Sequence, residues 1–213
     1  MTSRPSGRPR EFDPEQAVRD AARLFWRHGF SGTSTRMLTN ELMISSSSLY
    51  AAFGSKASLF DAAVRTHIRR YALIYERAVQ EENLGDVIRR LLIDSVVEFT
   101  GMEDEDAGCL TNSAAMADTS DTLNVRAFVG ESQQKDEALL RARIERAVMD
   151  GEVPDYTDAV ALSDLVQSLW HGLSVRANLG VERSELLGTA ELACGVFERA
   201  FSATESDGRS GGA

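Results

Sequence analysis

TSTRMLTNELMISSSSLYAAFGSK, residues 33–56, predicts two short helices joined by a tight turn and the start of a third helix. Thr33 or Ser34 is placed to cap the first helix, whose apolar residues recur at helical spacing. Ser46 is expected to cap the second helix and Gly54 to end it. Two short helices with such a turn are the skeleton of a helix-turn-helix, whose second helix enters the DNA major groove.

Side chains suited to DNA contact are concentrated in and around this stretch. Ser46, Ser47 and Ser48 are small and polar, so we expect them to approach base edges at the exposed start of the second helix. Tyr50 and Lys56 are expected to hold phosphates of the backbone. The full predicted set of DNA contacts is Arg4, Arg8, Arg10, Thr33, Ser34, Arg36, Ser45, Ser46, Ser47, Ser48, Tyr50 and Lys56.

The run from Phe12 to Phe60 resembles the DNA-binding domain of TetR-family transcriptional regulators. The matching segments are AARLFWRHGFSGTS at residues 21–34, SLYAAFGSK at residues 48–56 and the pair Leu59–Phe60. The resemblance implies a three-helix DNA-binding domain followed by helices that bind a ligand and dimerise. It also implies a repressor that binds a palindromic double-stranded operator as a homodimer and is released by a small-molecule effector.

The turn departs from the family pattern. The family usually has Gly in the turn and a basic residue followed by Gly at the start of the recognition helix. This chain has Met43, Ser46 and Ser47 at these places, so the base preference of relatives cannot be carried over.

Composition and periodicity predict an all-α protein with a three-helix helix-turn-helix domain followed by a helical bundle, about nine helices in total. The chain has 213 residues, 43% of them hydrophobic, and contains 4 Pro and little of the alternation typical of strands. We expect a disordered basic arm at 1–11, a DNA-binding head at 12–60, a ligand-binding and dimerisation body at 61–203 and a disordered tail at 204–213.

Charge is divided unevenly along the chain, whose formal net charge is −10. The first 70 residues hold 11 Lys+Arg and 6 Asp+Glu, whereas the rest hold 12 and 27. A basic head on an acidic body concentrates the attraction for phosphate at one end. Arg4, Arg8 and Arg10 make the arm basic, and it either lies in the minor groove or is a solvated tail.

The predicted helix at 157–179 carries two apolar stripes, one of Leu162, Leu165, Leu169 and Leu173 and the other of Val166, Trp170 and Ala177. Five long helices are predicted after the helix-turn-helix, at 55–80, 83–100, 121–150, 157–179 and 184–203. Thr157 opens the fourth and Ser184 caps the fifth. A short helix and a turn are predicted after the acidic run at 103–106. A helix apolar on two sides needs two partners, which predicts a homodimer through 157–179 and 184–203. The alternative is that both stripes are buried within one chain. Trp170 lies on one stripe, so Trp170→Glu tests whether that stripe is the dimer seam.

Candidate ligand-binding residues in the body combine apolar surface with a polar tip. They are His67, Tyr71, Phe99, Cys109, Asn112, Trp170 and His171. The segment around Cys109 and Asn112 resembles the ligand-binding part of one TetR-like subgroup. Cys109 also offers an alternative function, a thiol sensor of oxidants or electrophiles, although its charged neighbours in sequence are acidic and disfavour a thiolate.

Catalytic and membrane signals are weak in the sequence. The three histidines are scattered at 28, 67 and 171, and no nucleophile elbow, P-loop or dinucleotide-binding motif occurs. We therefore expect no enzyme activity, no cofactor and no metal, with an enzyme of an unfamiliar helical type as the remaining alternative.

No apolar run of membrane-spanning length and no signal peptide are present, and the two cysteines suggest no disulfide framework, so we expect a cytoplasmic protein without a membrane partner.

Overall fold

The computed structural model describes residues 13–101 and 125–202, and every regular element in these ranges is an α-helix. The helices are α1 (Pro14–Gly32), α2 (Thr35–Glu41), α3 (Ser46–Phe53), α4 (Lys56–Ala78), α5 (Leu84–Phe99), α7 (Val125–Met149), α8 (Ala159–Asn178) and α9 (Arg183–Ser202). These eight described helices confirm the predicted all-α class. The predicted short helix and turn near residues 107–120, Cys109 and Asn112 lie outside the described ranges, as do Arg4, Arg8 and Arg10.

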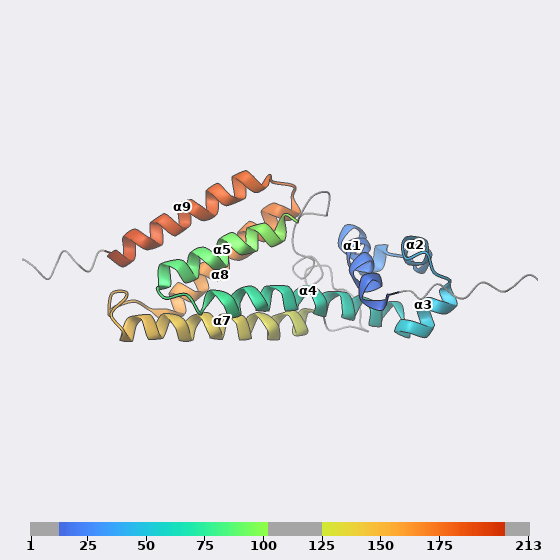
Figure 1. The fold of residues 1–213 in the computed structure, drawn as a ribbon, viewed down its shortest axis with the longest axis horizontal. Helices are drawn as coiled ribbons and strands as arrows, with labels where there is room; N and C mark the ends of the chain where they lie inside the picture. Colours follow the sequence, from blue (N-terminus) through green and yellow to red (C-terminus); the bar gives the residue numbers. More distant parts are fainter. Residues whose placement is uncertain (1–12, 102–124, 203–213) are drawn as a thin grey trace, which may run out of the picture.

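The molecule is elongated, with the head at one end (Figure 1). α1, α2 and α3 form the head, and α4 runs from it into the body, where it packs against α5 and α7. α8 packs on α7 and α5, and α9 packs mainly on α5. Within the described part of the chain, no helix is long and apolar enough to cross a membrane.

Several helix starts follow directly from local sequence. The Asp13 carboxylate accepts from the Glu15 N–H at the start of α1, and Pro14 takes the first helical position. Ser34 caps α2 by accepting from the Met37 N–H. Within α1, Gly29 has a φ of 68° and makes a kink, after which the helix continues to Gly32.

Three predicted helix starts were wrong by one or two residues. Ser45, not Ser46, caps α3, because Ser45 keeps an extended backbone while its hydroxyl accepts from the Ser48 N–H. Asp158, not Thr157, caps α8, with its carboxylate accepting from the N–H groups of Val160 and Ala161. α9 begins at Arg183, so Ser184 lies inside its first turn. Neighbouring residues of similar capping ability cannot be ranked from sequence alone.

α4 contributes to two separate hydrophobic cores. Leu59 and Phe60 pack in the head core with Phe25, while Tyr71 and Tyr75 belong to the body core. The head core also takes in residues beyond 60: Ala63 and Val64 of α4 and Val129 of α7, with Ile68 and Phe128 packed against it. The sequence-based boundary at 60/61 therefore falls inside a continuous helix, and the domain division stays a prediction.

Candidate nucleic-acid interface

α3 presents its serines outward because its apolar residues Leu49 and Phe53 pack against the head core. Leu49 is fully buried under the helix, against the head core. Ser46, Ser47 and Ser48, in the first turn of α3, are exposed. Tyr50 is 47% exposed, and its hydroxyl lies 3.3 Å from the Thr35 hydroxyl at the start of α2. The outer surface of α3 therefore consists of three serines, two alanines and one tyrosine.

The turn before α3 forms without a glycine. Met43 adopts a φ of 53°, in the left-handed region that β-carbon-bearing residues rarely occupy. Its side chain is 86% exposed and thus gains little packing in return. The turn geometry is consequently supplied by the packing of α2 and α3 rather than by the preference of the turn residue itself.

Ser45 organises the first turn of α3. Its hydroxyl accepts from the Ser48 N–H at 3.0 Å and lies 2.8 Å from the Ser47 hydroxyl and 2.9 Å from the Ser48 hydroxyl. Ser45 was predicted as a DNA contact, and the structure gives it a capping role in addition. Base contact by Ser46, Ser47 and Ser48 stays a prediction.

Lys56 binds the end of α1 in this structure. Its ammonium donates to the backbone carbonyls of Phe30 at 2.8 Å and Thr33 at 2.9 Å, and lies 4.2 Å from the centroid of the Phe30 ring. A cation is favoured at the C-terminal end of a helix, where carbonyls lack partners. Two of its three N–H donors are therefore engaged within the head, and the predicted phosphate contact stays untested.

Thr33 is not available for the predicted DNA contact. The residue is fully buried, and its hydroxyl lies 2.7 Å from the Gly29 carbonyl and 3.2 Å from the Leu24 carbonyl, to which it donates. The sequence prediction placed it at the exposed start of a helix, but the kink in α1 turns its side chain into the head core. Ser34 and Arg36, by contrast, are exposed beside α3.

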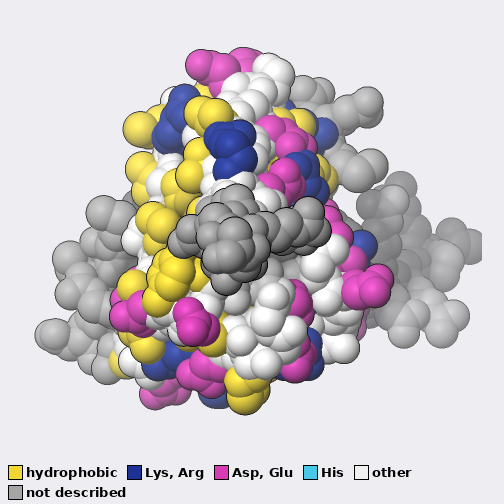
Figure 2. Space-filling model, turned by 90° about the vertical axis from the view of Figure 1, so that its left-hand side faces the viewer, with side chains coloured by type: hydrophobic (Ala, Val, Ile, Leu, Met, Phe, Trp, Pro, Cys, Tyr) yellow, Lys and Arg dark blue, Asp and Glu magenta, His cyan; other side chains and the backbone are white. Residues whose placement is uncertain are grey.

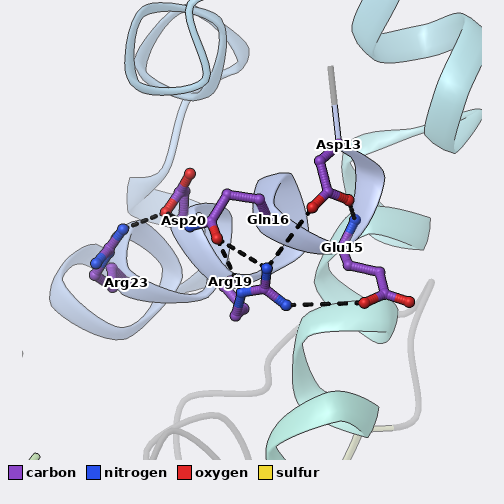
Figure 3. A network of polar contacts seen from close by, with 6 residues as sticks. All are labelled: Asp13, Glu15, Gln16, Arg19, Asp20 and Arg23. Atoms are coloured by element: carbon purple, nitrogen blue, oxygen red, sulfur yellow. Dashed lines mark hydrogen bonds and ion pairs between the residues drawn. The ribbon is translucent and has the colours of Figure 1, made fainter. Parts of the chain in front are cut away.

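The outer face of α1 is occupied by a network of paired charges (Figure 3). Arg19 lies 3.9 Å from the Asp13 carboxylate and 4.0 Å from that of Glu15, and it donates to the side-chain oxygen of Gln16. Asp20 pairs in turn with Arg23 one turn further along the helix. Because acidic groups offset these arginines, this face offers a phosphate little net attraction, and the exposed side of α2 and α3 is the better candidate.

A small cavity lies in the body beneath the head. It is lined by Ile68, Tyr71, Tyr75, Val129, Ser132, Gln133, Asp136, Gln167 and Trp170. Its volume, counted as the space that the centres of water molecules can occupy, is about 20 Å³. This is room for about one or two waters. Tyr71 and Trp170 were among the sequence candidates, whereas the polar lining from α7 and α8 was missed. A helical pattern does show which side chains face inward, but not which inward polar groups meet.

The other candidates described by the structure pack around the cavity without lining it. His67 stands edge-on to Tyr71 with ring centroids 5.0 Å apart, and Phe99 and His171 contact Trp170 at 5.1 and 5.0 Å. Burial, with a smaller contribution from Arg70, lowers the pKa of His67 to about 3, so the ring is neutral at pH 7. Burial likewise lowers the pKa of His171. These residues form an aromatic wall behind the cavity.

Asp136 is the charged group of the cavity. Burial raises the pKa of this carboxyl to about 6, with a further contribution from Glu76 and an opposing one from Lys135. The residue is 9% exposed. Tyr75 lies near enough for Asp136 to raise its pKa further, above an already large increase caused by burial. The cavity therefore combines a carboxyl with aromatic rings in a poorly hydrated site.

Comparisons with known proteins agree with this arrangement. The sequence profile described as "Bacterial regulatory proteins, tetR family" matches residues 18–63. The chain is similar to the HTH-type transcriptional repressor ComR of Escherichia coli strain K12, with 26% identity over 186 residues, covering 86% of this chain and 88% of ComR.

Two solved structures are similar over most of their length. A cysteine mutant of the TetR family regulator CifR, complexed with 26bp double-strand operator DNA, has 32% identity and a TM-score of 0.77, with 88% of this chain and 98% of that chain covered. A putative TetR transcriptional regulator from Rhodococcus sp. RHA1 has 34% identity and a TM-score of 0.61, covering 86% and 99%.

Proposed function

Because this chain belongs to the TetR family of bacterial transcriptional regulators, we propose that it is a repressor that binds a near-palindromic operator as a homodimer. A small molecule bound in the body cavity releases the DNA. The main support for DNA binding is the exposed serine-rich surface of α3, which the buried Leu49 holds outward.

Operator recognition is proposed to come from α3 lying in the major groove. Ser46 and Ser47 are exposed and small enough for close approach to base edges, and Tyr50 offers its hydroxyl to a phosphate. The relative CifR, at 32% identity, was solved on double-strand operator DNA, which supports the same use of this head.

Selection from random double-stranded DNA tests this proposal, followed by gel shifts on the selected sites. The wild type should return an inverted repeat whose half-sites are about one helical turn apart, or a multiple of it. The double variant Ser46→Ala, Ser47→Ala should lose about 1–3 kcal/mol at specific base positions and select a different motif. Ser184→Ala, an exposed serine of α9, is the matched control. An unchanged motif in the double variant would remove these serines as readers.

Dimerisation is proposed through the exposed apolar faces of α8 and α9. Leu165 and Val175 on α8 are 51% and 43% exposed, and Leu192 and Val196 on α9 are 68% and 51% exposed. Hydrophobic side chains gather along one side of the end of the body shown in Figure 2. Apolar surface of this kind on two adjacent helices is typical of an interface.

Two helical glycines support the same face. A β-carbon added at Gly172 or Gly188 would meet no atom within 4 Å in this chain. Glycine inside a helix costs about 1 kcal/mol relative to alanine. No close contact within this chain requires a glycine at either position. Close approach of a partner helix is a physical reason for both. Trp170, by contrast, is 5% exposed and donates its indole N–H to the Ser95 hydroxyl at 2.8 Å, so Trp170→Glu would damage the fold of one chain.

Light scattering at micromolar concentration tests the dimer. Wild type should be a dimer, and Leu192→Glu with Val196→Glu should be a folded monomer with an unchanged circular dichroism spectrum. Gly172→Leu should also block association, whereas Gly172→Ala is expected to be tolerated better. A monomeric wild type would overturn this part of the proposal.

The cavity is placed to influence the head. Val129 lines the cavity and also belongs to the head core, and Ile68 lines the cavity and packs against that core. On the aromatic side, Trp26 of α1 lies 6.4 Å from His67, whose ring contacts Tyr71. A ligand that separates α4 from α7 would therefore displace groups on which α1 rests. It shifts the DNA equilibrium only if it binds one arrangement better than the other.

Effector release is tested by gel shifts with a panel of metabolites. A coupling of about 1–3 kcal/mol would weaken DNA binding roughly 5- to 150-fold, and DNA would weaken effector binding by the same factor. Cys109→Ser separates a reversible pocket from a thiol sensor, because only the sensor loses its response. If neither metabolites nor oxidants change DNA binding, the body serves dimerisation alone.

A further inference from the structure

We propose that the cavity lined by Asp136 and the aromatic rings of α4 and α8 is a recognition site for an organic ammonium group, so that the effector is an amine. This inference rests on the proposed function, because it takes this cavity as the effector site.

The first support is the pairing state of Asp136. Its carboxylate is 9% exposed, yet none of the ion pairs in residues 13–101 and 125–202 includes it. The described charged groups that act on it are Glu76 of α4 and Lys135 of its own helix, while the neighbouring α8 residue in the cavity is the neutral Gln167. A buried carboxylate without a counterion is costly, and a bound cation would supply one.

The second support is the rest of the lining. Tyr71, Tyr75 and Trp170 line the same cavity, and aromatic rings attract organic cations through their negative faces. Ser132 and Gln167 offer oxygens that accept from an N–H donor. The space of about 20 Å³ also suits an ammonium head, which is close to water in size, and the cavity is only partly enclosed, so a short carbon chain would extend through its open side.

The third support is the field of the whole body. The chain carries a formal net charge of −10, and the excess of Asp and Glu lies after residue 70. Such a field raises the local concentration of cations and disfavours anions. An anionic effector would meet both this field and the Asp136 carboxylate, whereas a protonated amine is favoured by each.

Isothermal titration of the DNA-free full chain at pH 8 tests the proposal with three probes of equal length: n-butylamine, n-butanol and butyrate. The amine is protonated at this pH, as a lysine side chain is. We expect n-butylamine to bind at least about tenfold more tightly than n-butanol, because an opposite charge is worth roughly tenfold or more in a buried site. Butyrate should not bind.

Two variants and a change of pH locate the recognition. Asp136→Asn keeps the shape and should abolish the preference for the amine, whereas Glu145→Gln, which removes one exposed charge of the same helix, should keep it. With a pKa of about 6 for Asp136, about one carboxyl in ten is charged at pH 5. Amine binding should therefore fall about tenfold between pH 8 and pH 5 in the wild type and stay constant in Asp136→Asn.

The outcomes separate this inference from the proposed function. Tighter binding of n-butanol or butyrate, an amine preference that survives Asp136→Asn, or no binding of any probe would overturn the amine site while leaving operator binding and dimerisation untouched. If the amine binds as expected but gel shifts show no release of DNA by it, the amine site stands and the effector part of the proposed function fails.

Discussion

Replacing Lys56 by methionine separates a structural from a DNA-binding role for this lysine. Its ammonium donates to the carbonyls of Phe30 and Thr33 at 2.8 and 2.9 Å and lies over the Phe30 ring. Methionine keeps most of the apolar stem but leaves both carbonyls without this donor.

The expected loss of stability follows from these contacts. A hydrogen bond to a charged group contributes about 1.5–3 kcal/mol when shielded from water. The two bonds share one half-buried ammonium, so solvent competes for it, and we expect Lys56→Met to lower the free energy of unfolding by about 2–3 kcal/mol. Urea unfolding followed by circular dichroism measures this difference.

The DNA measurement is the salt dependence of operator affinity. A lysine that neutralises one phosphate contributes about 0.9 to the slope of log affinity against log salt. The structure leads us to expect an unchanged slope in Lys56→Met, whereas Arg36→Met, at an exposed position of α2, should reduce the slope by about 1 with stability changed by less than about 0.5 kcal/mol. Unchanged stability together with a reduced slope in Lys56→Met would refute the structural role and support the original phosphate assignment.

Three further changes test other parts of the structure. Met43→Asn should stabilise the protein by about 0.5–1 kcal/mol, since asparagine tolerates a φ of 53° better, and the exposed Met149→Asn should give no such gain in urea unfolding. Thr33→Val should cost about 1–2 kcal/mol, because the carbonyls of Leu24 and Gly29 lose the single hydroxyl proton that they share, while the salt slope of DNA binding stays constant; a reduced slope would restore Thr33 as a contact. The pKa of Asp136 is raised to about 6, above its value of about 3.9 in an unfolded chain, so its ionisation destabilises the fold as pH rises from about 4 to 6. Asp136→Asn should thus gain about 2 kcal/mol at pH 7 and nothing near pH 3, and equal effects at both pH values would show that the carboxyl is not buried.

The sequence determined the elements whose signals are local. Asp13 with Pro14, Ser34 and the apolar spacing along α3 each act within four residues of the chain, so capping and periodicity could be read before any tertiary structure existed. The same holds for the resemblance of the head to a known family, because many spaced positions agree at once.

The tertiary structure alone decided which polar groups meet. Lys56 reaches carbonyls 26 and 23 residues away, and Thr33 is buried by a kink that brings its hydroxyl to Leu24, nine residues back. Asp136 of α7 is the charged group of a cavity because the packing of α4 and α8 brings Tyr75 and Gln167 to the same place. Pattern along a helix shows only which face is inward, whereas hydrogen bonding and pKa depend on partners from distant segments, whose distances are set by how the helices pack.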